Sequence, residues 1–377
     1  MYTDYDIGII GGGLAGLSLA LLAAEAGYSV VLFEKENYPF HKVCGEYISY
    51  ESYDFLNRLG LPFPDWKLPS IRKLVVSDLK GNGYQFKLDL GGFGISRYAI
   101  DHFLYLLALQ KGVQVFTNEK VNDVRFEKDI QVIHTNREET TVKIAAGAYG
   151  KRSNLDVKWE RKFAAKKMNK LNNYIGIKYH IKTAFPKDTI ALHNFKDGYC
   201  GISAVEKDKY CLCYLTNASN LSANNNSITQ MQENILYKNA FLKKIFTESE
   251  YLYNAPLTIS QISFERKTQV EDHVLLLGDA AGMITPLCGN GMSMAMHSAK
   301  LAFIEMNNFL QQKISRNEME RNYSSNWKKQ FAARLRTGRM VQRWMGNEFS
   351  TGMFLKIMSK FPVLSKAIIR STHGKSY

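Results

Sequence analysis

Residues 4–35 read DYDIGIIGGGLAGLSLALLAAEAGYSVVLFEK, and this stretch decides the fold class. Its first apolar run, residues 6–10, is short and ends at glycine, which is typical of a buried parallel strand. Residues 14–26 are mostly Leu and Ala, which favour a helix, and Gly27 follows where that helix should end. A second apolar strand is predicted over residues 29–33. The pattern is a βαβ unit and indicates an α/β protein with a Rossmann-type sheet.

The turn of this unit carries a glycine motif, because Gly11, Gly13 and Gly16 fit the spacing G-x-G-x-x-G. The first glycine permits a tight turn, the second lets the backbone approach a pyrophosphate, and the third lets helix and strand pack closely. The start of the helix offers free N–H groups to phosphate. Glu34 follows Gly16 by 18 residues, where a carboxylate can accept the hydroxyls of an adenosine ribose and would repel a 2′-phosphate. We predict a dinucleotide site that disfavours NADP.

The bulk composition is that of a globular protein large enough for two domains, at 377 residues with 45% hydrophobic and 22% charged residues. No run of about 18 apolar residues predicts a membrane-spanning helix. The first residues lack the pattern of an export signal. The five cysteines are scattered, which is typical of reduced thiols in a cytosol. We expect a cytoplasmic protein.

Most of the net charge of +14 lies near the end of the sequence, since residues 313–377 hold 14 basic and three acidic residues. Apolar positions recur every three to five residues over 317–343 and predict an amphipathic helix. A second apolar and basic segment follows at 354–370. Such a region fits peripheral contact with the inner face of an anionic membrane, or a solvated helical face. The alternative for the 317–343 helix is packing on the dinucleotide-binding domain. We expect no nucleic-acid partner.

The composition and the pattern of predicted strands and helices divide the chain into three regions. We predict a discontinuous dinucleotide-binding domain at 1–67, 92–155 and 265–315. Alternating, strand-rich segments predict an inserted substrate domain at 68–91 and 156–264, with a hairpin around Gly81 and one polar helix at about 229–246. Residues 316–377 form a basic helical C-terminal region.

A second cofactor loop is predicted in residues 274–299, VLLLGDAAGMITPLCGNGMSMAMHSA. A buried strand ends at Gly278 and places Asp279 at its carboxyl end, on the same sheet edge as the first glycine loop. A carboxylate there can bond a ribityl hydroxyl, a contact worth about 1.5–3 kcal/mol. The loop ahead of the helix that starts at Gly291 can direct N–H groups toward an anionic flavin ring. Two such loops fit one extended cofactor such as FAD.

Together with Arg97 and residues 147–153, these loops resemble the flavoprotein monooxygenase and geranylgeranyl-reductase superfamily, whose fold is similar to that of p-hydroxybenzoate hydroxylase. The resemblance covers residues 5–309. It implies non-covalent FAD, with the first glycine loop on the pyrophosphate, Asp279 on the ribityl chain and Arg97 assisting. The cofactor-binding residues that it implies are Gly11, Gly13, Leu14, Ala15, Gly16, Glu34, Lys35, Lys42, Arg97, Val121, Gly147, Gly278, Asp279, Pro286, Gly289, Asn290, Gly291 and Met292.

Residues 42–45 resemble the Cys-Gly loop that lies against the isoalloxazine ring in the geranylgeranyl-reductase branch. The resemblance makes Cys44, Gly45 and Glu46 the candidate catalytic loop. The alternatives are an inert buried cysteine and a surface carboxylate. Residues 198–201 resemble the start of that branch's substrate-domain motif, which implies Tyr199 and Gly201 as substrate contacts. We expect no metal site, because Cys211 and Cys213, which share a strand face, lack His or Cys partners at ligand spacing.

The sequence departs from the family pattern at two places. The family's G-A-D-G is G-A-Y-G here, with Tyr149 in place of an aspartate that serves the FAD and NAD(P)H sites in the hydroxylases. Ser203 and Ala204 replace an aromatic residue and a proline of the archaeal reductases. The sequence is more similar to bacterial FAD-dependent oxidoreductases of polyketide or lipid-like secondary metabolism.

The resulting hypothesis is an FAD-dependent oxidoreductase that acts through reduced flavin on an apolar small molecule, held between the FAD sheet and the β-rich domain. With no second glycine motif, NADH or NADPH would bind only transiently as reductant; an electron-donor protein or a quinol is the alternative. Two other functions stay open. One is an FAD monooxygenase that hydroxylates an aromatic or polyene substrate with NAD(P)H and O2. The other is a non-catalytic flavin- or lipid-binding protein.

Overall fold

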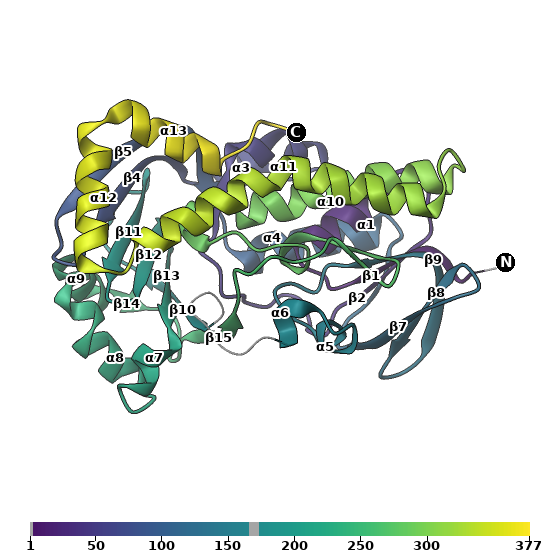
Figure 1. Ribbon diagram of the computed structural model, residues 1–377, viewed down its shortest axis with the longest axis horizontal. Helices are drawn as coiled ribbons and strands as arrows, with labels where there is room; N and C mark the ends of the chain where they lie inside the picture. Colours follow the sequence, from purple (N-terminus) through teal and green to yellow (C-terminus); the bar gives the residue numbers. More distant parts are fainter. Residues whose placement is uncertain (1–2, 166–172) are drawn as a thin grey trace.

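The computed structural model describes residues 3–165 and 173–377 and contains two sheets, with long helices running across both (Figure 1). Within the described residues the first sheet has eight strands, in the order β16-β17-β9-β1-β2-β6, with β7 and β8 continuing from β9. Its strands are β1 (Tyr5–Ile10), β2 (Val30–Phe33), β6 (Gln114–Phe116), β7 (Val121–Glu127), β8 (Ile130–Thr135), β9 (Glu139–Gly147), β16 (Val270–Glu271) and β17 (Val274–Leu276).

The predicted βαβ unit is confirmed: β1 and β2 are parallel and α1 (Leu14–Glu25) connects them. Helix α1 is apolar on all sides because it lies against the first sheet, α4 (Arg97–Gln110) and α10 (Gly291–Leu310). Its residues 14–23 are all buried.

Parallel pairing brings three strand ends to one edge of the first sheet. Ile10 pairs with Gly147 and Gly147 pairs with Leu276, so β1, β9 and β17 end side by side. The loops that follow carry Gly11, Tyr149 and Asp279 respectively. The predicted common edge for the two cofactor loops is therefore confirmed.

The second sheet has nine strands in the described part of the chain, in the order β14-β10-β13-β12-β11-β4-β5-β3 with β15 beside β10. The predicted hairpin around Gly81 is its β4–β5 pair. The strands are β3 (Tyr47–Ser49), β4 (Ser70–Ser77), β5 (Gly83–Gly94), β10 (Tyr174–Lys182), β11 (Thr189–Phe195), β12 (Gly198–Ala204), β13 (Tyr210–Asn217), β14 (Glu250–Tyr251) and β15 (Leu257–Ile262). Shorter helical segments connect the strands: η1 (Tyr50–Ser52), α2 (Tyr53–Arg58), α3 (Phe63–Trp66), α5 (Asn154–Lys158), α6 (Lys162–Ala165) and α7 (Ala218–Ser222).

The single polar helix predicted at about 229–246 is wrong. The chain forms α8 (Ile228–Asn234), the short turn η2 (Leu236–Lys238) and α9 (Ala240–Glu248). Asn239 causes the break: its buried amide donates to Ser77 Oγ and to the carbonyls of Asp78 and Asn194, while its oxygen caps α9. These bonds tie the turn to the β4 and β11 ends, and no local pattern predicts them.

Three helices complete the chain: α11 (Arg316–Trp344), α12 (Glu348–Lys360) and α13 (Pro362–Thr372). The predicted amphipathic helix is α11, whose Tyr323, Trp327 and Phe331 are buried in the core of the first sheet. Helices α12 and α13 lie along the second sheet at the left and top of Figure 1. No helix of the described residues is both long and apolar enough to cross a bilayer.

The tightest approach in the glycine turn generates a stability prediction. A Cβ on residue 16 would lie 2.0 Å from the Gly11 carbonyl oxygen, whereas one on residue 13 would keep 3.5 Å from its nearest neighbours. Gly16→Ala should therefore lower the free energy of unfolding by about 1–3 kcal/mol, through overpacking against rigid backbone. Urea unfolding measures the loss, and Gly13→Ala is the matched control with little expected change. Equal stability of the two variants would contradict this packing.

Candidate active site

The glycine loop folds tightly at the end of β1. Gly11 has φ of 102°, and a Cβ there would lie 2.6 Å from the carbonyl oxygen of Ala148 on the β9 loop. Only glycine meets both conditions. The start of α1 next to it has no capping side chain, so its first N–H groups stay free for a ligand.

Two cations point at the same loop. The Arg97 guanidinium and the Lys42 ammonium would each lie 3.5 Å from a Cβ on Gly13. Asp101 holds both, through a bidentate pair with Arg97 at 2.7 and 2.8 Å and a looser contact with Lys42 at 3.4 Å. The Arg97 and Lys42 cations and the positive end of α1 outweigh the single Asp101 carboxylate, so the surroundings of Gly13 carry net positive charge. This arrangement suits an anion such as a pyrophosphate.

Glu34 occupies the predicted place at the end of β2. The carboxylate is buried and accepts from the backbone N–H groups of Gly12 at 2.8 Å and Glu36 at 3.1 Å. Tyr38 packs over the loop, with its hydroxyl on the Gly12 carbonyl and its ring stacked on Tyr105 at 4.3 Å. Glu34 therefore shapes the loop itself, in addition to any contact with a ribose. Lys35 turns outward and pairs with Glu36.

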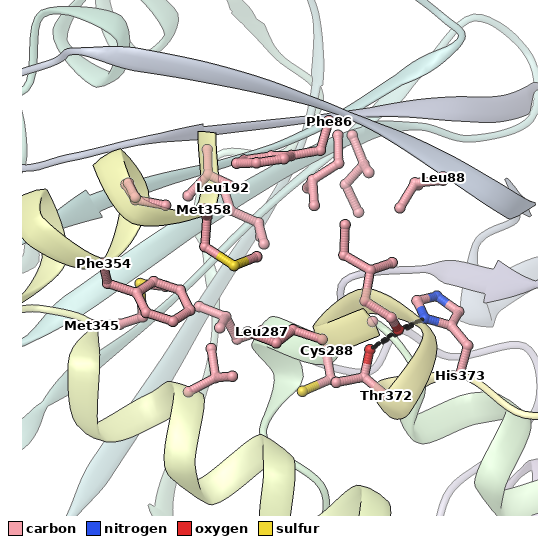
Figure 2. Close-up of a pocket in the computed structure, with 18 of the residues that line it drawn as sticks. Phe86, Leu88, Leu192, Leu287, Cys288, Met345, Phe354, Met358, Thr372 and His373 are labelled. Carbon is pink, nitrogen blue, oxygen red and sulfur yellow. Dashed lines mark hydrogen bonds between the residues drawn. The ribbon is translucent and has the colours of Figure 1, made fainter. Parts of the chain in front are cut away.

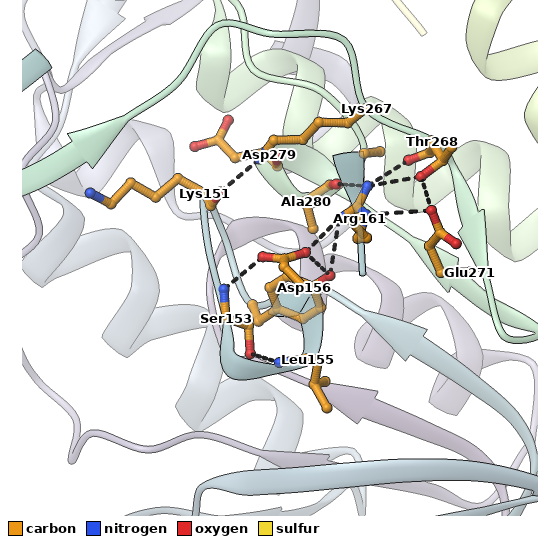
Figure 3. Close-up of polar contacts among 12 residues, drawn as sticks. Lys151, Ser153, Leu155, Asp156, Arg161, Lys267, Thr268, Glu271, Asp279 and Ala280 are labelled. Carbon is orange, nitrogen blue, oxygen red and sulfur yellow. Dashed lines mark hydrogen bonds and ion pairs between the residues drawn. The ribbon is translucent and has the colours of Figure 1, made fainter. Parts of the chain in front are cut away.

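Asp279 follows β17 in the turn η3 (Gly278–Ala280) and shares the sheet edge with the glycine loop. Within the described residues its carboxylate accepts no hydrogen bond, so it is available to a ligand hydroxyl. Burial raises its pKa, against the opposing effect of Lys267, Arg97 and Lys151. Lys267 donates to the carbonyls of Asp279 and Lys151 and fixes the turn (Figure 3).

Tyr149, which stands where the family has an aspartate, contacts an aspartate that follows it by seven residues. The Tyr149 hydroxyl donates to Asp156 Oδ1 at 2.8 Å, and Arg161 pairs with the same oxygen at 2.6 Å. Arg161 also donates to the carbonyls of Thr268 and Ala280, which links this cluster to the Asp279 turn (Figure 3). A buried carboxylate is thus present near the β9 end, but it belongs to Asp156 and is already neutralised by Arg161.

The candidate catalytic loop is held by side chains of the second sheet. Lys178 of β10 donates to the Lys42 carbonyl at 3.0 Å, Cys211 of β13 to the Cys44 carbonyl at 3.2 Å, and Ser203 of β12 to the Gly45 carbonyl at 3.2 Å. A Cβ on Gly45 would meet nothing within 4 Å. The loop is therefore fixed from behind and open in front.

Glu46 is the anchor of this loop. It is fully buried at φ of 55°, bonds the Lys178 ammonium and lies 2.5 Å from His180 Nε2. Its Oε1 also accepts a hydrogen bond from the backbone N–H of Arg97, the first residue of α4, at 2.8 Å. Burial alone would raise its pKa, but Lys178 and His180 outweigh that effect and hold the pKa at about 2. Glu46 joins both sheets as an ion and has no surface toward a substrate.

Cys44 differs from Glu46 because it keeps some exposure at the front of the loop. Burial raises the pKa of its thiol, against the nearby Arg97. It is therefore a protonated thiol at neutral pH and suits a proton donor better than a nucleophile.

Glu46, His180 and Cys211 place potential ligand atoms within 4.8 Å of one another. The Lys178 ammonium already bonds the Glu46 carboxylate and supplies the positive charge that a metal ion would bring. Glu46 is therefore held in an ion pair, and the Cys211 thiol donates to the Cys44 carbonyl.

An apolar cavity of about 100 Å³ lies between the second sheet and helices α11–α13, with its floor at the turn η4 (Pro286–Cys288) and Gly289 (Figure 2). The sequence predicts a substrate between the two sheets, whereas this cavity is covered by C-terminal helices that the sequence does not predict there. The polar members of the lining are few: Tyr47, Cys288, Thr372 and His373. His373 Nδ1 lies 2.8 Å from the Ile369 carbonyl, which makes that nitrogen the donor and leaves Nε2 as an acceptor.

The candidate substrate residues lie beside this cavity rather than in its lining. Gly201 pairs with the lining residue Leu192, and Tyr199 is buried in the same apolar cluster. The Tyr199 hydroxyl lies close to the backbone of Leu287, a residue of the cavity lining.

Three further predicted cofactor residues are buried. Val121 lies at the start of β7, and Met292 lies in the first turn of α10. The Asn290 amide donates to the Thr372 carbonyl at the end of α13.

Six groups that support the site are not predicted from the sequence: Asp101, Asp156, Arg161, Lys178, His180 and Lys267. Asp101 had a local signal, since it follows Arg97 by four residues on one helix. The others are contributed by distant strands and loops.

The buried ion pair generates a pH-dependent prediction. Glu46→Gln leaves Lys178 buried without a counter-charge, which should lower the free energy of unfolding by about 3–5 kcal/mol at neutral pH. Because the folded pKa of about 2 lies below the ordinary 4.5, the contribution is full above pH 4.5 and is lost as the pH falls toward 2. Denaturant unfolding from neutral to acid pH measures it. The control is Glu250→Gln, which breaks an exposed ion pair with Lys182. Lys182 lies on β10, the strand that also carries Lys178, and this substitution should change the free energy of unfolding little. A pH-independent difference would contradict the pairing.

Comparison with known sequences starts from the glycine loop. Residues 9–43 match the family described as "NAD(P)-binding Rossmann-like domain". The chain is 24% identical to conditioned medium factor receptor 1 of Dictyostelium discoideum, over 96% of this chain and 72% of that protein. It is also 24% identical to the 1H-pyrrole-2-carbonyl-[peptidyl-carrier protein] chlorinase of Pseudomonas fluorescens, over 86% of this chain and 82% of that protein.

Solved structures show the same arrangement of elements. The flavin-dependent brominase Bmp2 superposes with a TM-score of 0.79 at 19% identity, covering 98% of this chain and 93% of that one. A geranylgeranyl bacteriochlorophyll reductase-like protein of Thermoplasma acidophilum superposes with a TM-score of 0.77 at 16% identity, covering 99% and 96%. The chain therefore shares its fold with a flavin-dependent brominase and with a geranylgeranyl reductase-like protein, and its first cofactor loop lies in the matched Rossmann-like segment.

Proposed function

We propose that the chain binds FAD without a covalent bond and is an oxidoreductase that acts through reduced flavin on an apolar small molecule. The observation that carries the proposal is the common edge of β1, β9 and β17, where the positively charged Gly13 loop and the free Asp279 carboxylate lie together. FAD supplies the electron-transfer chemistry when bound. The brominase of the same fold is described as flavin-dependent, which supports this choice of cofactor.

Different residues of the site would bind different parts of the cofactor. The α1 N-terminus with Arg97 and Lys42 would bind the pyrophosphate, Glu34 the adenosine ribose and Asp279 the ribityl chain. Gly45 and Gly289 are the residues that would contact the flavin ring. Cys44 precedes Gly45 and is a protonated thiol, so we assign it the role of proton donor.

The cavity favours an apolar substrate with one or two hydrogen-bonding groups. Most of its lining is aliphatic or aromatic, and it shares Gly289 with the loop assigned to the flavin. A dry wall of this kind excludes water from reduced flavin. His373 Nε2 and the Tyr47 hydroxyl are the groups that would select a polar end of the substrate.

A second candidate is an oxygen-dependent reaction, either hydroxylation or halogenation. The observation that favours it is the similarity over most of the chain to the Pseudomonas chlorinase and to the brominase Bmp2. Anaerobic mixing of reduced protein with the substrate distinguishes the classes. A reductase oxidises its flavin with substrate alone, whereas a hydroxylase or halogenase requires oxygen, and a non-catalytic flavin protein does neither.

Arg97→Met should weaken FAD binding about tenfold to a hundredfold, because it removes a charge-assisted contact worth about 1.5–3 kcal/mol. Titration of the apoprotein with FAD, followed by flavin fluorescence, measures the change. Lys73→Met is the matched control, since Lys73 is exposed on β4, pairs with Asp188 and lies outside the proposed cofactor site. If the wild-type protein does not bind FAD, or if both variants bind alike, the proposed cofactor site is wrong.

Leu192→Trp should fill the cavity and lower kcat/KM for an apolar substrate at least tenfold while FAD binding stays unchanged. The added ring would occupy the space between β11 and the C-terminal helices. Leu106→Trp on the exposed face of α4 is the control. Before a substrate is identified, mass spectrometry of small molecules extracted from each purified variant provides the readout. Unchanged extracts would place the substrate elsewhere.

A further inference from the structure

The outer faces of α12 and α13 expose a concentration of large apolar side chains. Phe349, Phe361 and Val363 are 78%, 59% and 84% exposed. The exposed apolar residues between positions 340 and 364 are Met340, Trp344, Phe349, Met353, Ile357, Phe361, Val363 and Leu364. Phe349, Met353 and Ile357 follow one another at four-residue spacing and form a continuous stripe along α12.

Basic residues accompany this stripe. Lys356, Lys360, Lys366 and Arg370 are exposed on α12 and α13, and Glu348 is the acidic residue of these two helices. Asp89 of β5 pairs with Lys366 at 3.0 Å and Arg370 at 3.1 Å, while Lys356 and Lys360 have no ion pair within the described residues. The surface is therefore both apolar and positively charged.

The same two helices line the cavity with their inner faces. Leu355 and Met358 of α12 and Ile369 of α13 point into it, opposite the exposed stripe. A helix that is apolar on both faces normally has apolar surroundings on both. The cavity and the second sheet provide one of them, and the outer one is open.

Charge decides between two occupants of the outer face. In a symmetric dimer this surface would face its own copy, so Lys356 and Lys360, unpaired among the described residues, would be brought from both copies into one interface that holds an excess of positive charge. An anionic bilayer instead attracts the basic residues and accepts the apolar ones at the level of the headgroups.

We propose that α12 and α13 form a docking surface for anionic membranes. Phe349, Ile357, Phe361 and Val363 insert at the headgroup–acyl boundary, and the lysines contact lipid phosphates. The docking itself is independent of the proposed function. A second consequence, that the apolar substrate reaches the cavity from the bilayer between these helices, does depend on it.

The test is sedimentation of the full-length protein with phosphatidylglycerol–phosphatidylcholine vesicles and with phosphatidylcholine vesicles alone. We expect binding to the anionic vesicles only, with a decrease as the salt concentration rises. Phe349→Ser with Val363→Ser should reduce the partition coefficient at least tenfold, and so should Lys356→Glu with Lys360→Glu. The control is Leu106→Ser with Val157→Ser, which removes side chains that are 49% and 56% exposed away from these helices and should leave binding unchanged.

Three outcomes overturn the proposal: no binding by the wild-type protein, equal losses in the control, or a concentration-dependent dimer that Phe349→Ser with Val363→Ser dissociates in the absence of vesicle binding. The last result would assign the surface to a second copy of the chain. The FAD content of each variant is measured in parallel. A protein that retains FAD but ignores vesicles contradicts the docking surface and leaves the proposed function intact.

Discussion

The parallel pairing of β1, β9 and β17 is the constraint on which the site depends. Hydrogen bonds between these strands fix Ile10, Gly147 and Leu276 side by side, so segments almost 270 positions apart end at one edge. Parallel strands must point their carboxyl ends the same way, and ligands of open α/β sheets bind there. The Gly11 conformation follows from this crowding, because the β9 loop passes where a side chain would project.

The second sheet is joined to this edge by a buried charge rather than by apolar packing alone. Glu46 bonds Lys178, His180 and the first N–H of α4, and three further bonds hold the carbonyls of residues 42, 44 and 45. Apolar contacts change little in energy when two surfaces slide by a small distance. These directional hydrogen bonds, by contrast, fix one position of the 42–46 loop relative to the second sheet. The loop beside the proposed flavin is therefore positioned by the β-rich sheet, although it belongs to the other part of the chain.

Local patterns predicted the parts of the molecule that local physics determines. The βαβ unit, Asp279 at a strand end and the long helix α11 each have a signal within a short window. The partners of Glu46 have none, because Lys178 and His180 follow it by 132 and 134 positions and are brought there by β10. Asn239 breaks a helix through bonds to two distant strands. The helical cover of the cavity was missed for the same reason: amphipathic periodicity says that a helix packs, but not against which surface.

Asn290 connects the flavin loop to the cover of the cavity, since its amide holds the Thr372 carbonyl at the end of α13. This hydrogen bond joins the proposed cofactor site to the cavity proposed for the substrate. Any occupant that shifts the Gly289–Asn290 backbone changes the free energy of α13, and any occupant of the cavity that displaces α13 acts back on the loop. Thermodynamic linkage requires the two effects to be equal, so a cofactor that changed the affinity of the cavity for a ligand would have its own affinity changed by that ligand by the same factor.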